Sequence, residues 1–429
     1  MTNRHRAAGH LSGMMRAIFA RLVDTAKLYP RTALILLTAL NLLNYIDRSV
    51  LFAVQPLVQN EFSLSNTQIG YLTSAFLGFY MLAAPFIGPL ADRYSRKPII
   101  VWGAIFWSGL TLLTAVTNTY TELLIRHTLV GIGEATFVTI APTFLVDLFP
   151  AEKRGRILGV FYLAIPVGTA AGYILGGQLG PSHGWRFPFY IAAVPGFLLA
   201  LLFALVPEPK RGQYDRVNDT PQRATIFGLF RNPAFLAANL GMAFMTFALG
   251  GIQVWMPTFL VRARGFSLQD ATKLFGIIVV LDGIAASLLG GWLGDVLLRR
   301  WKSSYYMVSA VSMALGIPMM IVALFSAGRA MIPAITLAAF FLLLNTSPLN
   351  AAVINSVSPS IRATAIAANI WIIHILGDVP SPTMMGWAAD HKTLQSAFIL
   401  PVIAMAVSSA ILFYGMRFAP EVRVEGAAR

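Results

Sequence analysis

The chain has 429 residues, of which 57% are hydrophobic and only 12% are charged, and its net charge is +14. An average soluble domain is about 45–50% apolar and about 25% charged, so this composition excludes an ordinary soluble protein and indicates a chain whose solvent is lipid. The positive charge does not indicate nucleic-acid binding, because Lys and Arg occur in short clusters between apolar runs. Cysteine is absent, which excludes disulfides, thiol nucleophiles and cysteine-ligated metals.

Residues 1–30 do not resemble a cleavable signal peptide, because their apolar residues are spaced for one face of a helix. Basic residues occupy the rest of that helix, including Arg16, Arg21 and Lys27. A basic amphipathic helix lies in the interface of an anionic leaflet, which places this N-terminus in the cytoplasm. We therefore expect a cytoplasmic, interfacial helix here, with a disordered tail as the alternative.

Twelve apolar runs follow, each with the ~20 residues that a helix needs to cross a bilayer. The predicted fold is an all-α membrane protein with twelve transmembrane helices. The runs begin near Ala33, Ile69, Ile99, Thr121, Ile157, Phe187, Phe235, Thr272, Tyr305, Ile332, Ala363 and Leu394.

Basic residues occupy alternate connections between these runs, and Lys and Arg are retained on the cytoplasmic side of a membrane. We therefore expect these loops and both termini to be cytoplasmic, and the protein to be a multi-pass component of the cell (inner) membrane. The clusters are Arg93, Arg96 and Lys97; Lys153, Arg154 and Arg156; Lys210, Arg211, Arg216, Arg223 and Arg231; and Arg299, Arg300 and Lys302.

The longest polar connection, residues 207–231, divides the runs six and six. It predicts a cytoplasmic linker between an N-terminal bundle (31–206) and a C-terminal bundle (232–418), with a cytoplasmic tail (419–429). The segment Gly88-Pro-Leu-Ala-Asp92-Arg93 in the first half is matched by Gly291-Trp-Leu-Gly-Asp295 in the second. Internal repeats of this kind are typical of secondary transporters that bind substrate near the bilayer midplane, between the halves.

The segment from Gly88 to Lys97 resembles G-x-L-A-D-R-x-G-R-K, the signature between helices 2 and 3 of the major facilitator superfamily, although Ser95 replaces the usual second Gly. The resemblance implies two bundles around a cavity lined by helices 1, 4, 7 and 10, with alternating access. It also implies a cytoplasmic gate, an ion network that breaks and reforms. The gate residues are Gly88, Asp92, Arg93, Arg96 and, at the end of helix 4, Asp147. Charges that serve topology alone are the alternative.

The fifth run carries Pro166, Gly168 and Gly172. Small residues at helical spacing let helices approach closely, and Pro permits bending. This pattern also resembles the superfamily and predicts a helix-packing face, although ordinary membrane packing would produce it too.

Four further stretches resemble the Spinster family of lysolipid and sphingolipid-phosphate transporters. They are Asn44-Tyr-Ile-Asp-Arg48, Gly131-Ile-Gly-Glu134-Ala135, Ala141-Pro142 and His374-Ile-Leu-Gly-Asp378-Val-Pro-Ser-Pro382. Because these stretches run from helix 1 to helix 11, the resemblance covers nearly the whole chain. It implies transport of an amphiphilic anionic lipid.

Asp47, Arg48 and Glu134 place charges near the centre of helices 1 and 4. A charge at the bilayer centre costs at least roughly 2.5–3.5 kcal/mol, so such residues are expected to be paired or functional, and all three can meet. Arg48 would anchor a phosphate or carboxylate. We hypothesise that protonation of Glu134 or Asp47 frees Arg48 for the substrate headgroup, and that deprotonation recaptures it. A permanent salt bridge among the three residues is the alternative.

Helix 4 departs from the superfamily where His127 occupies the place of the usual Arg, which is shifted to Arg126. His titrates near neutrality, so His127 could relay protons. Equally, it could lie at the outer interface. The two alternatives stay open.

Polar residues also interrupt the apolar runs of the second half, namely Asp282, Asp295, Asn345, Asn350, Asn369, His374 and Asp378. His374 and Asp378 are four residues apart and share a helix face, so they can hydrogen-bond as a polar clamp. One His and one Asp do not make a metal site, because no further ligands stand at helical spacing. Tyr45, Asn345, Asn369 and His374 are expected to join Arg48 and Glu134 in binding substrate.

The sequence therefore predicts a proton-coupled secondary active transporter of a lysophospholipid or sphingoid phosphate. It contains no phosphate-binding Walker loop and no nucleophile, base and metal set, so we expect neither ATP hydrolysis nor an enzyme, and no cofactor besides the proton. The expected partners are the bilayer and a lysolipid-like small molecule, not nucleic acid, and the protein is expected to be monomeric. A carrier of a small hydrophilic organic anion or sugar, a lipid scramblase and an intramembrane lipid-modifying enzyme are the alternatives.

Overall fold

A computed structural model describes residues 30–212, 226–326, 328–358 and 361–420. The predicted interfacial helix lies outside the described residues, apart from Pro30, which begins the first described helix. The middle of the linker and most of the tail lie outside them as well.

The first half consists of seven helices that form six spans, because α6 and α7 continue one another. Their bounds are α2 (Pro30–Phe62), α3 (Asn66–Arg93), α4 (Arg96–Thr114), α5 (Tyr120–Leu148), α6 (Ala151–Tyr162), α7 (Ala164–His183) and α8 (Phe187–Ala204). A short helix, α9 (Ile226–Leu229), lies in the connection that follows.

The second half has more interruptions. Its elements are α10 (Pro233–Arg264), α11 (Leu268–Leu298), α12 (Ser304–Phe325), η1 (Gly328–Ala330), α13 (Met331–Leu343), α14 (Thr346–Asn355), α15 (Arg362–Ile373), η3 (His374–Asp378), α16 (Pro380–His391), α17 (Leu394–Ala397), α18 (Ile399–Gly415) and η4 (Met416–Phe418).

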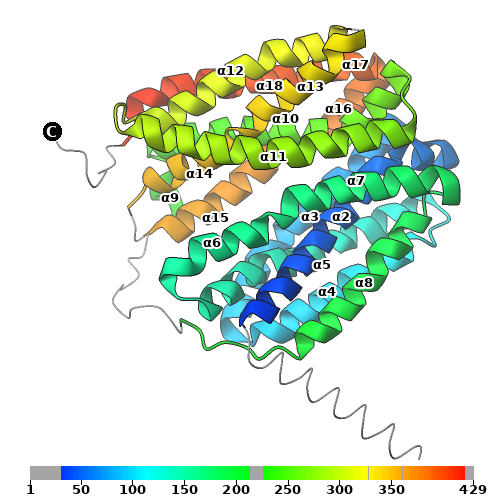
Figure 1. Cartoon of the computed structure of the whole chain (residues 1–429), viewed down its shortest axis with the longest axis horizontal. Coiled ribbons are helices and arrows are strands. Elements are labelled where there is room, and N and C mark those ends of the chain that lie inside the picture. The colour runs from blue at the N-terminus through cyan, green and yellow to red at the C-terminus, as the bar shows by residue number, and fades with distance from the viewer. Residues whose placement is uncertain (1–29, 213–225, 327, 359–360, 421–429) are drawn as a thin grey trace, which may run out of the picture.

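Eleven helical segments of the described chain are long and apolar enough to cross a membrane. The twelfth span, residues 362–391, is divided into α15, the π-helical turn η3 and α16. The prediction of an all-α protein with twelve spans is therefore confirmed. In Figure 1, α2 to α8 form the lower group of helices and α10 to α18 the upper group, as expected for two bundles.

The two halves contact each other mainly through two helix pairs, α7 with α11 and α3 with α16, with smaller contacts of α10 with α2 and of η3 with α3. The contacts concentrate at the membrane side that carries the short loops, such as residues 63–65 and 265–267, which we call the short-loop side. Tyr173 of α7 donates to the carbonyl of Gln253 in α10 at 2.6 Å, and Gln178 donates to the carbonyl of Gln269 at 3.2 Å. Asp390 of α16 reaches the first turn of α3.

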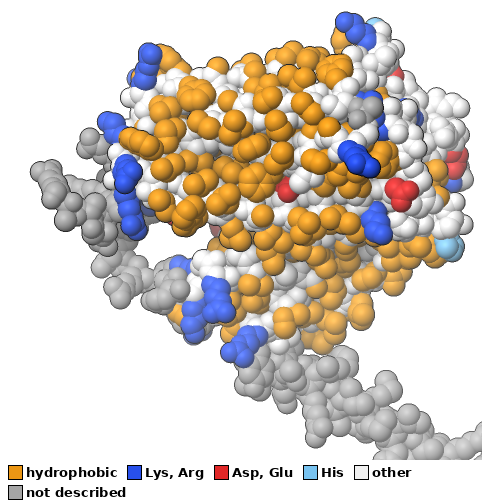
Figure 2. Space-filling view, turned by 45° about the horizontal axis from the view of Figure 1, so that its top comes forward, with side chains coloured by type: hydrophobic (Ala, Val, Ile, Leu, Met, Phe, Trp, Pro, Cys, Tyr) orange, Lys and Arg blue, Asp and Glu red, His pale blue; other side chains and the backbone are white. Residues whose placement is uncertain are grey.

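Toward the opposite side, which carries the linker and which we call the linker side, the halves separate. Gly88 in α3 and Gly155 and Gly159 in α6 have open space where a side chain would be. Figure 2 shows hydrophobic side chains over most of the face that it presents and a hollow between the halves. The structure is therefore closed on the short-loop side and open on the linker side.

Within the first half, α7 packs closely on α2. This packing fixes the position of α2, the helix that carries Asp47 and Arg48. A Cβ at Gly172 would lie 2.5 Å from the carbonyl oxygen of Ile46, and one at Gly168 would lie 2.6 Å from that of Leu42. Pro166 lies at the seam between the halves, where a Cβ at Gly283 would be 3.0 Å from its ring. Only glycine permits these backbones to approach so closely.

Candidate functional site

Arg48 and Glu134 form an ion pair between α2 and α5, near the middle of both helices. Arg48 Nε donates to Glu134 Oε2 at 2.6 Å. The Glu134 side chain is fully buried, and that of Arg48 is 14% exposed. Of the three charges expected to cluster at the midplane, these two do so.

Three aromatic rings surround the guanidinium of Arg48. Its Cζ lies 5.1 Å from the ring centre of Tyr45, 5.0 Å from that of Phe76 and 4.8 Å from that of Tyr80. Rings at this distance attract a cation through their quadrupole, most strongly where water is excluded. The cage therefore holds the guanidinium of Arg48 through the faces of three rings.

Several buried polar atoms around this pair have no hydrogen-bond partner among the described residues. They are Nη2 of Arg48, Oε1 of Glu134 and both side-chain atoms of Asn44. A buried donor or acceptor without a partner costs about 1–3 kcal/mol, so such atoms indicate where water or a polar ligand would bind. This site offers both a cationic donor and acceptors.

Asp47 does not join the ion pair but bonds to a different helix. The side chain is buried and accepts a hydrogen bond from the Thr111 hydroxyl of α4. Successive residues of a helix point about 100° apart, so Asp47 faces α4 while Arg48 faces α5. The described residues show no ion pair between Asp47 and Arg48.

His374 brings the second half to the same cage. Its ring packs edge-on against Tyr80 with 5.9 Å between ring centres, and its Nδ1 lies 2.8 Å from Asp378 Oδ1. Both residues belong to the π-helical turn η3, where the N–H of Val379 donates to the carbonyl of His374. Pro380 has no N–H to donate to the preceding turn, so the regular hydrogen-bond pattern of the helix is interrupted there. This proline was the sequence signal for an irregular turn at this point.

The other polar residues of the second half do not contact Arg48. Asn369 donates to Asn239 of α10 at 2.7 Å, and Asn345, which follows α13, donates to carbonyls in the last turn of that helix. Asp295 accepts from the Tyr305 hydroxyl at 2.8 Å, while Asp282 is buried with Oδ2 lacking a partner among the described residues. None of these contacts reaches Arg48.

His127 is buried inside the first half, next to the cage of Arg48. Only 3% of it is exposed, and its ring stacks on Phe76, one wall of the cage, at 5.0 Å between ring centres. Arg126 lies nearer the surface, where it pairs with Glu122 at 3.6 Å and donates to the carbonyl of Leu113.

The residues expected at a gate between the halves bond only within the first half and the linker. Arg96 pairs with Asp147 at 2.6 Å, and both are buried. The backbone carbonyl of Asp92 accepts from Arg211 of the linker, while Arg93 is exposed and Gly88 is half-buried. Among the described residues, these groups do not bind the second half, which agrees with the separation of the halves on this side.

The linker residue Glu208 was missed by sequence reasoning, although it holds the start of α4. Its carboxylate accepts from the backbone N–H of Arg96 at 2.8 Å and from the Ser95 hydroxyl, so the departure at Ser95 adds a donor. Partial burial opposes ionisation of Glu208. The hydrogen bonds from Ser95 and from the backbone of Arg96 and Lys97, together with the Arg96 charge, outweigh it and lower the Glu208 pKa.

No group of three potential metal ligands among His, Cys, Asp and Glu occurs in the part of the chain that the structure describes. The site therefore consists of an ion pair, an aromatic cage and a His–Asp pair on a membrane-spanning scaffold.

Two helical bundles that meet around buried midplane charges define a secondary transporter of the major facilitator type, and residues 37–377 match the family described as the Major Facilitator Superfamily. The chain is 34% identical to protein spinster homolog 1 of Xenopus laevis over 399 residues, which are 87% of this chain and 76% of that protein. It is also 34% identical to the Homo sapiens protein of the same name, over 84% of this chain and 74% of that one. The chain therefore belongs to the Spinster family of this superfamily.

Solved structures agree with this fold. A bacterial homologue of the human lysosomal transporter spinster, in an inward-facing and unoccupied conformation, superposes with a TM-score of 0.83 at 26% identity, covering 92% of this chain and 98% of that one. A D-xylose–proton symporter superposes with a TM-score of 0.72 at 18% identity, covering 90% and 97%, which shows the shared fold alone. The protein is thus an integral, multi-pass membrane transporter rather than an enzyme.

Proposed function

We propose that this transporter carries an amphiphilic anion, such as a lysophospholipid or sphingoid phosphate, by proton-coupled alternating access. The observation that carries the proposal is Arg48, whose Nη2 has no hydrogen-bond partner among the described residues while three aromatic rings surround its guanidinium. An Arg held in this way offers forked donors to a phosphate or carboxylate.

A second feature supports an amphiphilic rather than a hydrophilic substrate. An apolar cavity of about 560 Å³ lies between Pro85 of α3 and one face of α15 and η3, where Trp371 and Ile375 line it. No charged residue lines this cavity, and Ile375 is next in sequence to His374, which contacts the Arg48 cage. The cage and the cavity are both bordered by α3 and η3, so the proposed substrate places its headgroup at Arg48 and its hydrocarbon chain in this cavity, whose volume is typical of small-molecule sites.

Proton coupling is proposed to act through the bond between Arg48 and Glu134. When Glu134 takes up a proton, it no longer neutralises Arg48, and the guanidinium becomes available for an anion. Loss of the proton recaptures Arg48 and favours release. Asp47, buried against Thr111, is the second candidate for the coupling acid.

The orientation is proposed from the basic clusters. They support an orientation with the linker side, both termini and the gate residues Gly88, Asp92, Arg93, Arg96 and Asp147 in the cytoplasm, and a location in the inner membrane of the cell. The state described here would then be open to the cytoplasm. The proposed functional unit is a monomer with no cofactor other than the coupling proton.

Uptake of a fluorescent lysophospholipid into proteoliposomes, with and without an imposed pH gradient, tests the proposal. We expect Glu134→Gln to abolish the response to the gradient, and Asp47→Asn to abolish it if that residue is the coupling acid. Glu122→Gln is the matched control, because Glu122 lies in the same helix but pairs with Arg126 near the surface.

Three results would contradict parts of this proposal. Undiminished gradient response in both Glu134→Gln and Asp47→Asn would eliminate these acids. Uptake of a sugar or small organic anion, without lysophospholipid, would favour a hydrophilic substrate. Lipid flux that ignores the gradient in the wild type would indicate a scramblase.

A further inference from the structure

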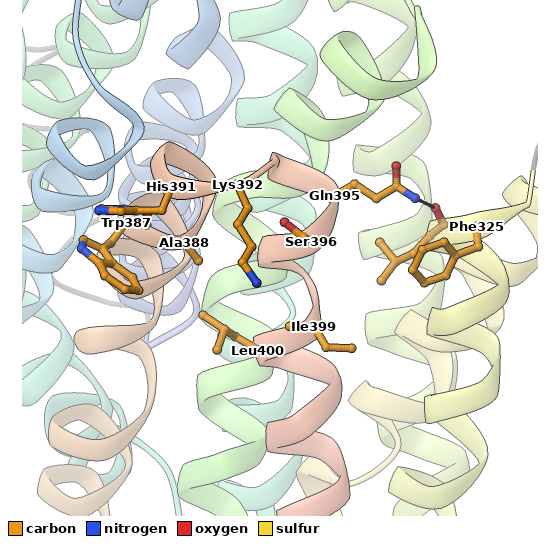
Figure 3. Close-up of a pocket in the computed structure, with 10 residues that line it drawn as sticks. Phe325, Trp387, Ala388, His391, Lys392, Gln395, Ser396, Ile399 and Leu400 are labelled. Carbon is orange, nitrogen blue, oxygen red and sulfur yellow. Dashed lines mark hydrogen bonds between the residues drawn. The ribbon is translucent and has the colours of Figure 1, made fainter.

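A groove on the outer surface of the second half lies far along the chain from the Arg48 site, at the short-loop side. It has a volume of about 400 Å³ and is formed by the end of α12, the end of α16 and the start of α17 and α18 (Figure 3). Its lining includes Leu324, Phe325, Trp387, Lys392, Ile399 and Leu400.

The floor of this groove is apolar and faces outward. Phe325 is 67% exposed, Trp387 56% and Ile399 46%. Because these residues stand at the ends of membrane-spanning helices, they lie where hydrocarbon meets headgroups, a level at which Trp is enriched. Exposed hydrophobic side chains there are covered by lipid rather than water.

The rim of the groove is cationic. In Figure 3, the Lys392 side chain extends over the groove toward Leu400 and Ile399. The described residues show no ion pair of Lys392, and no carboxylate lines the groove. The nearby Asp390 is occupied elsewhere, because its two oxygens accept hydrogen bonds from Asn66 and Thr67 of α3.

Other polar groups at the rim are already engaged. Gln395 Nε2 donates to the carbonyl of Leu324 at 2.7 Å, and His391 Nδ1 lies 2.9 Å from the carbonyl of Trp387. A carbonyl only accepts hydrogen bonds, so Nδ1 carries the proton. Lys392 is therefore the one lining residue with a fixed charge and free donors.

We propose that this groove binds an anionic phospholipid of the leaflet on the short-loop side. Its phosphate lies at Lys392, and one acyl chain follows Leu324, Ile399 and Leu400. Charge complementarity selects an anionic over a zwitterionic lipid, because no acid in the lining attracts a choline or ethanolamine headgroup. This site is independent of the transported substrate and of the Arg48 mechanism.

The test counts lipids that remain bound to the purified full-length chain by native mass spectrometry, after titration with phosphatidylglycerol or phosphatidylcholine. We expect the wild type to retain one phosphatidylglycerol in preference to phosphatidylcholine. Lys392→Gln should weaken this retention about five-fold, which corresponds to about 1 kcal/mol for one Lys at an anionic lipid surface. Ala388→Trp, which fills the groove, should abolish the preference.

Lys273→Gln is the matched control, because Lys273 is an exposed cation in the first turns of α11, on the same side of the membrane but outside the groove. It should retain phosphatidylglycerol as the wild type does. Equal retention of the two lipids by the wild type, or equal losses in Lys392→Gln and Lys273→Gln, would overturn the proposal. If Ala388→Trp does not fold, the comparison of the two Lys variants still decides.

Discussion

Single side chains in this transporter are held by partners of different kinds, and Arg48 is the clearest example. One carboxylate and three aromatic rings fix its guanidinium, whose planar shape suits both contacts. Lys would keep the charge but would lose the forked donors and the stacking. The residue type therefore matters as much as the charge.

Glu208 gives a prediction at this scale. Its pKa is lowered in the folded protein, so its contribution to stability is complete above the ordinary pKa of Glu, about 4.3, and is lost as the pH falls through the lowered value. Glu208→Gln should therefore lower the thermal midpoint in detergent at pH 7, and the difference from the wild type should shrink below about pH 4.

Ser95→Gly restores the residue usual in the superfamily and serves as the comparison. It removes one hydrogen bond to Glu208 but leaves the backbone donors, so its effect should be smaller and in the same direction. A difference between Glu208→Gln and the wild type that stays the same from pH 7 to well below pH 4 would contradict this account.

The sequence indicated the chemistry of the site better than its geometry. Charges at the centre of apolar helices must be paired, which predicted the bond between Arg48 and Glu134. The separation of Asp47 was not predictable, because its partner Thr111 is a weakly polar residue that carries no signal of its own. Glu208 lies in a linker, where there is no hydrophobic periodicity from which its contact with the start of α4 could have been predicted.

At the scale of helices, small residues decide how closely elements pack. The faces of Gly168 and Gly172 on α7 touch the backbone of α2, the helix that carries Arg48. Their spacing predicted a packing face. The π-helical turn at His374 was not predicted, because one extra residue in a turn depends on how the whole span fits its neighbours.

Gly172→Ala tests this packing. Its added Cβ would lie 2.5 Å from the carbonyl oxygen of Ile46, so α2 and α7 must move apart. We expect a loss of about 1–3 kcal/mol in stability and a lower thermal midpoint in detergent. Gly159→Ala is the control, because open space surrounds that position and alanine favours a helix. Equal effects of the two substitutions would contradict the packing role.

At the scale of the molecule, the number and positions of the spans followed from hydrophobicity, because the bilayer fixes the length of each helix. The sequence did not predict on which side of the membrane the two halves separate. A transporter sequence must be compatible with both open states, so no residue pattern selects one. The contacts of the short-loop side define the state described here.

Asp390 links the halves on that side, so we predict that Asp390→Asn increases the population that is open there. Asp390 accepts from the backbone N–H groups of Asn66 and Thr67 at 2.8 Å. Spin labels at Asn118→Cys and Lys273→Cys, one in each half, would report the change as a longer distance. The chain has no cysteine of its own, so these labels have no background.

Asp270→Asn is the control for this measurement, because that carboxylate also lies on the short-loop side but bonds only to Ser267 at the start of its own helix. Its distance distribution should match the wild type. An unchanged distribution in Asp390→Asn would show that the apolar seams alone keep this side closed.

The bond of Asp390 to the start of α3 also has a consequence for timing. When this side opens, the N–H groups of Asn66 and Thr67 lose their bonds to the Asp390 carboxylate, and water and ions replace these bonds on both partners. That exchange occurs in the aqueous compartment rather than in lipid, so its free energy depends on the salt and acidity there. The salt concentration and pH on the short-loop side would thus set the lifetime of the state that is open on the linker side.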